Sequence, residues 1–455
     1  MAYAKADALP EGEPHLESAE FKRSAHPDRL AGSVALDAGA AVVRLDPAAR
    51  FDIHVILNYG NLCIDLGGIP LLYLPSVPLA YVGGQISTVV PEREYHMAMG
   101  KAVRQSFSFA GYNAQNCFDP QDMLLELQFN RQSEQVAHGI DKKGGKKGAG
   151  DATIVHAYAS SQTKEYLPAS QVLAWKITQL LDQALREGSI NGLWPDGKVQ
   201  VDVSFGCCCN AFPVNPLRAE NVIVAAQHAP GIDKGKFKDA IAKLVRSANA
   251  VLSDPKGRLL NLIDSRTDIV VNGAGDFSKG GPLADTGEGG GMDGHYASGS
   301  TRKYGGGLLV GRDVTKPDFS CQLIARNIAL HLVRGGIAAE ALVSIDYGIG
   351  QTAPSKVSVD AEGCQYSSKD LLAAINKAFD LSPEGIINQL NISHKDYSAI
   401  ARDGFFGIKP NGSHQWEKTS REKLEILRQH LKKCPKISQH SGNGVRIAKA
   451  ATQPS

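Results

Sequence analysis

Residues 20–29 combine the side-chain types that could bind a metal ion and phosphate. Within these ten positions lie Glu20, His26, Asp28 and Arg29, and a proline stiffens the backbone between the imidazole and the second carboxylate. A carboxylate can bind a hard cation, a guanidinium can bind phosphate oxygens, and an imidazole can donate a hydrogen bond to a developing anion. Alone, this segment is a weak signal, because His-Pro-Asp sequences also occur in surface turns.

Two further segments offer acids and cations. The glycines of residues 148–150 let the backbone approach a ligand closely, so that Asp151 could meet a metal or a sugar hydroxyl. An ordinary Gly-Asp turn explains the same pattern. Asp196 and Lys198 lie at the start of an expected strand, where alternation projects both side chains to one side. A surface ion pair of little energetic value is the simpler interpretation of that pair.

Two later segments complete the phosphate pattern. The backbone N–H groups of the glycine-rich residues 276–294 could bend around phosphate oxygens, although composition does not distinguish this from a disordered loop. Residues 311–318 then supply Arg312, Lys316 and Asp318. Cations neutralise phosphate oxygens while a carboxylate holds the metal, so this spacing suits a magnesium-bound polyphosphate.

Composition limits the function classes. The 455 residues are too many for one small core and suggest about three domains, with an ordinary hydrophobic share of 43%. A net charge of +2 argues against charge-driven nucleic-acid binding, and no apolar run is long enough to span a bilayer. The first residues lack the layout of a signal peptide, and three consecutive cysteines at 207–209 do not suit a disulfide framework. We therefore expect a cytoplasmic protein without nucleic-acid or membrane partners.

Alternating β and α patterns predict an α+β protein. Apolar periodicity predicts helices at residues 30–43, 91–110, 170–187, 235–250, 321–334 and 368–379. It also predicts strands at 51–57, 62–66, 198–205, 221–227 and 342–347, with a turn at Tyr59-Gly60 between the first two. We expect domains at residues 14–135, 148–272 and 280–420, followed by a flexible basic tail at 421–455.

Taken together, these segments resemble the methionine adenosyltransferase, or S-adenosylmethionine synthetase, family of the bacterial and eukaryotic type, from about Glu17 to about Thr419. His26-Pro27-Asp28 resembles the family motif G-H-P-D-K, and Gly148–Asp151 resembles the start of G-A-G-D-Q-G. Further segments similar to family motifs are Gln132–Asp141, Pro195–Lys198, Gln227-His228, Gly280–Asp285, Gly305–Asp318, Asp346–Gly350, Phe379–Leu381 and Trp416–Lys418. The resemblance implies three structurally similar β-α-β-β-α-β domains in a pseudo-threefold arrangement.

The resemblance also implies a reaction. Methionine sulfur attacks C5′ of ATP, and triphosphate leaves and is then cleaved to pyrophosphate and phosphate. Because charge builds on a polyphosphate, such a site needs cations and N–H donors more than a base. By position, His26 would stabilise the leaving oxygen, while Asp28 and Asp318 would hold Mg²⁺. The other implied contacts are Arg29, Lys198 and Arg312 with phosphate, Asp151 and Phe277 with the nucleoside, and Gln132, Asp285, Lys316 and Ile349 with the amino acid; Glu20 and Asp196 are further members of the site.

Several positions depart from the family pattern. His54 stands where the family has an acid that helps to hold K⁺, and an imidazole is a poor ligand for that ion. The acid that faces the methionine ammonium falls near Gly67, where Asp65 could substitute. An Arg-Lys pair that grips the triphosphate aligns with Gly289–Met292, so the Arg302-Lys303 pair would have to compensate.

Three functions therefore stay open. The first is synthesis of S-adenosylmethionine by a homodimer or homotetramer whose sites lie between subunits. The second is a divergent relative that uses another nucleophile or does not hydrolyse triphosphate, because groups facing the methionine are altered while those facing ATP persist. The third is a non-catalytic, ATP-binding regulatory subunit of a true synthetase. Retention of His26, Asp28, Asp151 and Asp318 argues against the third.

Overall fold

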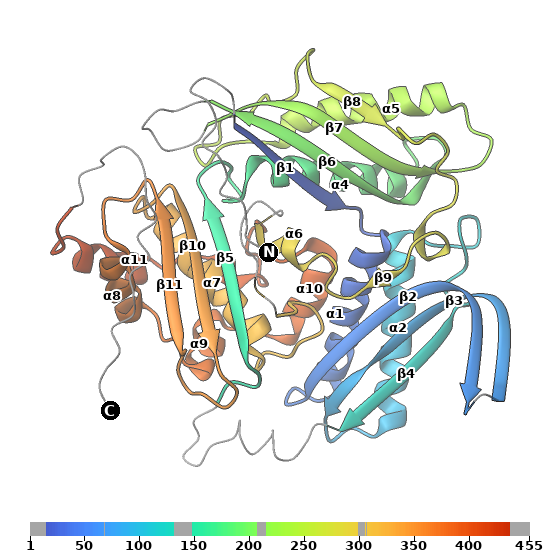
Figure 1. Cartoon of the computed structure of the whole chain (residues 1–455), viewed down its shortest axis with the longest axis horizontal. Helices are drawn as coiled ribbons and strands as arrows, with labels where there is room; N and C mark the ends of the chain where they lie inside the picture. Colours follow the sequence, from blue (N-terminus) through green and yellow to red (C-terminus); the bar gives the residue numbers. More distant parts are fainter. Residues whose placement is uncertain are drawn as a thin grey trace.

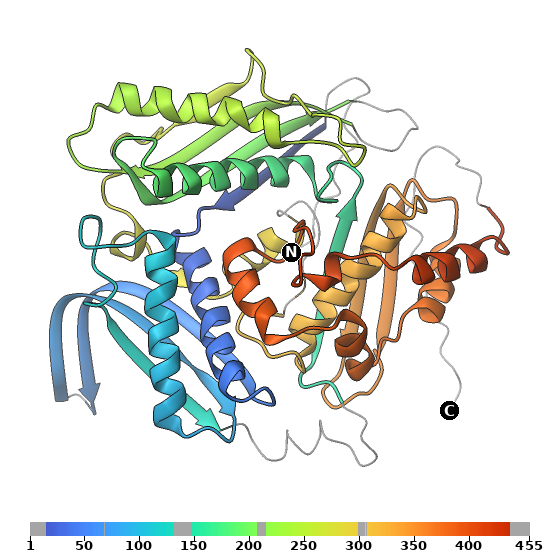
Figure 2. The same cartoon turned by 180° about the vertical axis from the view of Figure 1, so that it is seen from behind.

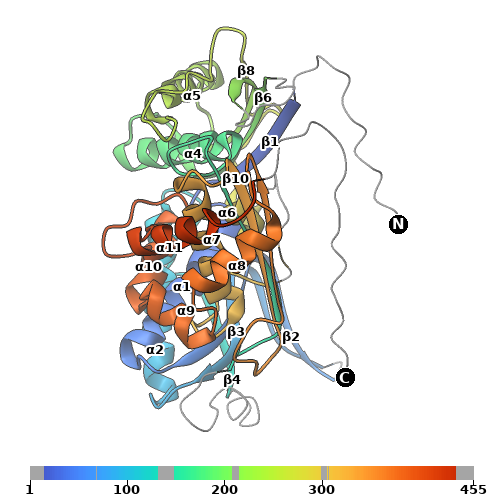
Figure 3. The ribbon, with the colours of Figure 1, turned by 90° about the vertical axis from the view of Figure 1, so that its left-hand side faces the viewer.

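The computed structural model describes residues 15–67, 69–131, 148–206, 215–298, 305 and 307–436. In this part of the chain the protein is an α+β structure with three β-sheets, which confirms the predicted fold class (Figure 1). Helices cover one side of the sheets, seen from the helical side in Figure 2 and edge-on in Figure 3. None of the described helices is both long and apolar enough to cross a membrane.

The first sheet has the strand order β4-β3-β2-β9. Its strands are β2 (Arg50–Leu66), β3 (Ile69–Ser87), β4 (Leu124–Arg131) and β9 (Gly287–Glu288), and its helices are α1 (Pro27–Leu45) and α2 (Glu92–Ala110). α1 is rich in small residues and buries nearly all of them, so it packs closely between this sheet and helix α10 (His394–Asp403). This helix begins at the His-Pro-Asp segment and therefore positions it.

The predicted turn at Tyr59-Gly60 is wrong. β2 continues through these residues and pairs antiparallel with β3 as far as Leu66 and Ile69. A register shift after Gly60 absorbs the residues that look like a turn in the sequence. The chain instead begins to reverse at Gly67, whose φ of 62° suits glycine.

The second sheet has the order β1-β6-β7-β8. Its strands are β1 (His15–Lys22), β6 (Leu193–Phe205), β7 (Pro216–His228) and β8 (Asp268–Val271), covered by α4 (Ala169–Glu187) and α5 (Lys234–Ser247); the 3-10 helix η1 (Ala248–Val251) extends α5. Alternate side chains of β6, from Val199 to Phe205, are fully buried against these helices.

The third sheet, β11-β10-β5, is entirely antiparallel. Its strands are β5 (Thr153–Ser160), β10 (Glu340–Tyr347) and β11 (Lys356–Glu362). The buried helix α7 (Pro317–Arg334) packs on β5 and β10. The remaining elements are η2 (Gly281–Leu283), α6 (Asp293–Ser298), α8 (Ser368–Ala378), α9 (Pro383–Leu390), η3 (Gln415–Glu417) and α11 (Arg421–Leu431).

Each sheet contains a strand that is distant in sequence from its neighbours. β1 precedes the first sheet in the chain but pairs with β6, and β9 follows the second sheet but pairs with β2. β5 likewise pairs with β10, which begins at Glu340. These exchanges place residues from distant segments side by side, while the predicted domain bounds stay a prediction.

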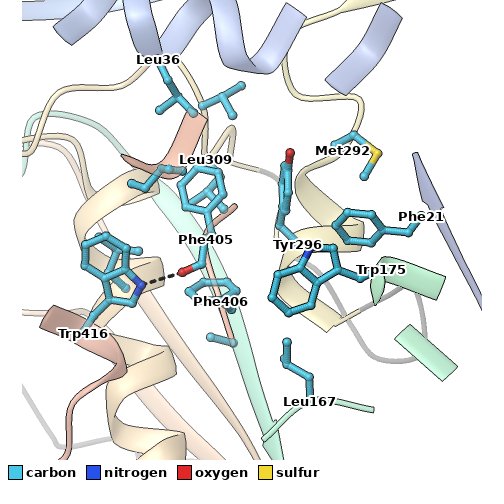
Figure 4. Close-up of a cluster of buried hydrophobic side chains, with 14 of the residues drawn as sticks. Phe21, Leu36, Leu167, Trp175, Met292, Tyr296, Leu309, Phe405, Phe406 and Trp416 are labelled. Atoms are coloured by element: carbon cyan, nitrogen blue, oxygen red, sulfur yellow. Dashed lines mark hydrogen bonds between the residues drawn. The ribbon is translucent and has the colours of Figure 1, made fainter. Parts of the chain in front are cut away.

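An aromatic cluster joins the layers in the interior (Figure 4). Phe21 of β1 packs edge-on against Tyr296 of α6, and Tyr296 contacts Phe405, with ring centroids 5.9 and 5.2 Å apart. The indole N–H of Trp416 donates to the carbonyl oxygen of Phe405 at 2.8 Å. Because Phe21 immediately precedes Lys22, this packing fixes the end of β1 next to the segment that leads to His26.

The six helices predicted from periodicity are confirmed as α1, α2, α4, α5, α7 and α8, with small shifts at their ends. The prediction of a flexible tail is wrong for its first residues. Residues 421–431, expected to be flexible, form α11, which buries Leu427 and Leu431 and packs on α8. Leu424, Leu427 and Leu431 recur at spacings of three and four residues, which is typical of an amphipathic helix.

Candidate active site

His26 occupies the N-cap of α1, where Pro27 is the first helical residue. Its Nδ1 accepts a weak hydrogen bond of 3.4 Å from the backbone N–H of Asp28, an arrangement that leaves the ring proton on Nε2. The side chain is buried, and burial lowers its pKa although the nearby carboxylate of Asp196 acts in the opposite direction. At neutral pH the imidazole is therefore an uncharged donor.

Asp28 lies in the first turn of α1 and faces the β9 segment. Its Oδ2 pairs with Lys22 Nζ at 2.5 Å, and its Oδ1 accepts from the backbone N–H of Glu288 at 3.1 Å. Burial raises the pKa of Asp28, but these hydrogen bonds and the charge of Lys22 outweigh it, so the pKa lies below its usual value. The carboxylate stays charged and partly exposed, as a metal ligand must.

The loop around Gly281 closes over Asp196, which is 4% exposed. The carboxylate accepts from the backbone N–H groups of Gly197 at 2.6 Å and Gly281 at 2.7 Å. Burial raises the pKa of Asp196. The nearby charges and hydrogen-bond donors lower it by a smaller amount, so the pKa lies above its usual value. Asp285 Oδ2 lies 4.0 Å from His26 Nε2, and the Asp285 side chain is 60% exposed. We call Lys22, His26, Asp28, Asp196 and Asp285 the His26 cluster.

A second group of charges surrounds Lys316, which caps the N-terminus of α7. Lys316 Nζ lies 3.1 Å from Asp151 Oδ2 and 3.2 Å from Asp52 Oδ2, and Arg312 pairs with the other oxygen of Asp52. Burial lowers the pKa of Lys316, but the two carboxylates outweigh it and raise the pKa above its usual value. Asp52, Asp151, Arg312 and Lys316 form the Lys316 cluster.

Asp52 is charged over the whole physiological range. Burial raises its pKa, but the hydrogen bond from His54 at 3.1 Å and the charges of Arg312 and Lys316 lower it to about 2. An isolated β-bridge between Asp52 and Arg312 brings β2 and the segment before α7 together. Both cations of the Lys316 cluster are thus already paired with a carboxylate of the same chain.

Asp318 lies in the first turn of α7 at a cavity of about 580 Å³. Its Oδ1 accepts from the Thr153 hydroxyl at 2.7 Å, and burial raises its pKa despite this hydrogen bond. A Cβ at Gly307 would lie 1.9 Å from the carboxylate, so only glycine leaves this approach open. Asp318 also senses the charges of Asp151 and Arg312, which places it beside the Lys316 cluster.

The other predicted residues are distributed more widely. Lys198 pairs with Glu20 at 3.1 Å on the strands β6 and β1, and both are partly exposed. The carbonyl oxygen of Phe277 accepts from the backbone N–H of His228 at 3.0 Å, its N–H donates to His228 Nε2 at 3.2 Å, and the residue is half-buried. Ile349 is 56% exposed beyond the end of β10. Gln132 lies outside the described residues, as do Arg302 and Lys303.

Arg29 does not join the His26 cluster. It is 4% exposed, its Nη1 donates to the carbonyl oxygen of Lys22 at 2.9 Å, and its guanidinium lies 5.4 Å from the ring centre of Phe21. The guanidinium is turned into the packed interior, because α1 rotates it about 100° from Asp28. Its implied contact with phosphate stays a prediction that this placement does not support.

Two residues of the clusters were missed in the sequence. Lys22 lies on the same face of β1 as Glu20, and Asp52 lies on the same face of β2 as His54. Alternation could therefore have paired each of them with a residue already under consideration. What the sequence could not supply is the partner, since Asp52 and Arg312 are 260 positions apart.

The residues present fit magnesium better than potassium. Among the described residues, no three His, Cys, Asp or Glu side chains gather closely enough to hold a metal by themselves. Mg²⁺ needs only one or two protein carboxylates when substrate phosphates supply further oxygens, and Asp28 and Asp318 meet that requirement. At the expected potassium position, His54 hydrogen-bonds to Asp52, whose oxygens are already taken by cations. This donor set does not fit K⁺.

The segment aligned with the missing Arg-Lys pair leaves little room for side chains. Gly291 lies against Asp28, and a Cβ there would be 2.8 Å from the Asp28 Cγ. Met292 is buried in the interior. Close packing against the carboxylate thus explains why glycine stands at this position in the present chain.

Comparison with known families identifies the chain. Residues 146–277 match the family model described as S-adenosylmethionine synthetase, central domain, and residues 279–418 match S-adenosylmethionine synthetase, C-terminal domain. Together the two matches cover more than half of the 455 residues and include Asp151, Asp196, Arg312, Lys316 and Asp318. They confirm the resemblance inferred from the motifs, and the chain belongs to the S-adenosylmethionine synthetase family.

Proposed function

We propose that this protein forms S-adenosylmethionine from ATP and methionine, with triphosphate as the leaving group. The observation that carries the proposal is the Lys316 cluster, where two cations and two carboxylates meet beside Asp318 within the matched family domains. Such a set can hold a polyphosphate and the head group of an amino acid. The reaction builds charge on the leaving triphosphate, which this set would stabilise.

The His26 cluster would act on the leaving oxygen. An uncharged imidazole with its proton on Nε2 donates a hydrogen bond without giving up a proton. Pro27 and the α1 N-cap hold the ring, so it needs no rearrangement as charge develops. Lys22 would turn from Asp28 to a phosphate oxygen once a metal occupies that carboxylate.

Asp28 and Asp318 would each offer one carboxylate oxygen to magnesium that arrives with ATP. Bound there, the metal supplies neutralisation of phosphate charge. Asp28 is ready for this role because its pKa is depressed. Asp318 binds a cation only after it loses its proton, and burial makes that loss harder.

We also propose that the active unit is a homodimer or a dimer of dimers. The described helices cover one face of the sheets, and none of them lies on the other face (Figure 3). Large apolar side chains are exposed on strands of all three sheets, among them Leu16, Ile56, Ile69, Ile154, Leu217 and Ile223. A second subunit on this face would bury them, as apolar interfaces of obligate dimers do. Analytical ultracentrifugation tests the proposal, and a monomer at micromolar concentration would refute it.

A cytoplasmic location belongs to the same proposal. Five cysteines of the described part are free thiols, namely Cys63, Cys117, Cys321, Cys364 and Cys434. Free thiols suit a reducing compartment.

One observation favours a second candidate, a relative that uses another nucleophile or leaves triphosphate intact. The position expected to face the methionine ammonium is Gly67 at the hairpin end, and Asp52 pairs with both cations of the Lys316 cluster. Both features would alter recognition of an amino-acid head group. A regulatory subunit without activity remains the third candidate.

One experiment separates these functions. The full chain is incubated with ATP, Mg²⁺ and methionine, with and without K⁺, and products are followed by mass spectrometry. S-adenosylmethionine with pyrophosphate and phosphate supports the full reaction, and we expect no dependence on K⁺. S-adenosylmethionine with intact triphosphate indicates that the second step is lost. ATP binding without any adenosyl product refutes the first proposal and favours another nucleophile or a regulatory role.

A further inference from the structure

A separate cavity opens on the helical side of the molecule. It has a volume of about 840 Å³ and lies between α4, the loop before α4, the C-terminal end of α7 and the loop 404–412. None of the residues of the His26 or Lys316 clusters lines it. We call it the Trp175 cavity after the buried indole in its wall.

Cations predominate around this cavity. Lys164, Lys176, Arg334 and Lys409 line it, opposed only by Glu165 and Asp403. Lys164 and Lys409 are exposed. Lys164 Nζ donates to the carbonyl oxygen of Val251 at 3.4 Å, a long hydrogen bond that an anion could replace. The surplus of positive charge favours an anion.

The inner wall is a buried ion pair on an aromatic ring. Lys176 Nζ lies 4.4 Å from the ring centre of Trp175 and 3.4 Å from Glu165 Oε1. Burial lowers the pKa of Lys176, although Glu165 partly offsets this effect. The second carboxylate oxygen, Glu165 Oε2, is fully buried and has no hydrogen-bond partner among the described residues. A buried carboxylate oxygen without a donor is costly, and a ligand that brings an N–H or O–H would relieve that cost.

The cavity wall is held in place by a buried hub. Arg326 pairs with Glu417 at 2.8 Å, and both side chains are almost fully buried. Arg326 also donates to the carbonyl oxygen of Glu165 at 2.9 Å, while Glu417 accepts from the Gly407 N–H at 3.1 Å. One ion pair thus fixes both the loop that carries Glu165 and the loop that carries Lys409, so the cavity is preformed.

The geometry points to a binding site in the Trp175 cavity for a small organic anion that also carries a hydroxyl or amino group. The anionic end meets Lys409 and Lys164 at the entrance, and the donor meets the Glu165 carboxylate at the inner wall. Carboxylates and phosphates share this chemistry, so the test must include both. The site is independent of the proposed reaction.

The test titrates the full chain with two matched pairs of probes in the millimolar range. L-malate and glycerol 3-phosphate carry the donor hydroxyl, while succinate and propyl phosphate lack it. Indole emission reports binding, because Trp175 forms part of the wall, and calorimetry measures the affinity independently. We expect one of the two hydroxyl-bearing probes, L-malate or glycerol 3-phosphate, to bind more tightly than its matched partner. Which of the two binds decides between a carboxylate and a phosphate ligand.

Three variants locate the binding. Lys409→Gln changes an exposed residue and should weaken binding roughly tenfold without altering the melting temperature. Glu165→Gln should remove the preference for the donor-bearing probe over its matched partner. Arg312→Gln, in the Lys316 cluster, should leave binding unchanged and so separates this site from the catalytic one. Lack of saturable binding for every probe, or equal affinity in the Lys409→Gln variant, would overturn the proposal.

Discussion

Replacing Asp52 by asparagine tests the reading of the Lys316 cluster most directly. The carboxylate pairs with Arg312 and lies 3.2 Å from Lys316 Nζ, and its side chain is only 17% exposed. Asparagine keeps the shape but removes the charge, which leaves two mostly buried cations with less compensation. We expect the Asp52→Asn variant to be less stable and to bind polyphosphate more tightly, because both cations become available to it.

The size of the stability loss follows from the pKa of Asp52. Its pKa falls from 3.8 to about 2, and each unit corresponds to about 1.4 kcal/mol, so the loss is roughly 2.5 kcal/mol of the free energy of unfolding. Because the folded pKa is depressed, this contribution is present above 3.8 and disappears as the pH falls through about 2. The difference between wild type and variant should therefore be full at neutral pH and should shrink only in strong acid.

Urea unfolding monitored by circular dichroism measures the stability, and calorimetry with tripolyphosphate measures the affinity. Asp239→Asn, at an exposed position of α5, is the matched control and should change neither quantity. Equal unfolding midpoints for wild type and Asp52→Asn would refute the inferred ion-pair network. Weaker tripolyphosphate binding would show that Asp52 organises the cations rather than neutralising them.

Three further predictions concern the candidate active site. His26→Ala should lower kcat by about two orders of magnitude with little change in the KM for ATP. Because burial lowers the pKa of His26, titration of this residue should not reduce wild-type turnover between pH 8 and the usual histidine pKa of 6.5. The affinity for Mg-ATP, measured by calorimetry, should decrease as the pH falls toward the raised pKa of Asp318, starting above the usual value of 3.8; a constant affinity down to that value would exclude Asp318 as a ligand. Gly291→Ala should displace Asp28, weaken magnesium-dependent turnover roughly tenfold and lower the free energy of unfolding by about 1 kcal/mol, and unchanged turnover in a steady-state assay would count against Asp28.

Sequence patterns predicted helices and strands well where residues close together in the chain determine the structure. Helix α2 buries one face, at Tyr95, Met99, Val103 and Ala110 among others, so its spacing was visible in the sequence. The turn at Tyr59-Gly60 failed because a register shift and a turn use the same residue types, and only pairing with β3 decides between them. The prediction of a flexible tail was wrong for α11, because its many charged residues outweighed the two buried leucines in the sequence pattern.

The candidate site shows the same division. Motif spacing singled out His26, Asp28, Lys316 and Asp318, whose roles stay predictions, and the structure places each of them at the start of a helix. It also implied a phosphate contact for Arg29, but the rotation of α1 turns that guanidinium inward.

The sequence by itself determined the family, the fold class and the residue types that carry the chemistry, because motifs and periodicity are properties of short segments. Only the tertiary structure decided which of these residues contact one another. An isolated β-bridge brings Asp52 to Arg312, and the loop around Gly281 closes over Asp196, across separations that no local pattern records. Burial and charge at those contacts then set the pKa of Asp52, His26 and Asp318, and a pKa depends on every neighbour in space rather than on neighbours along the chain.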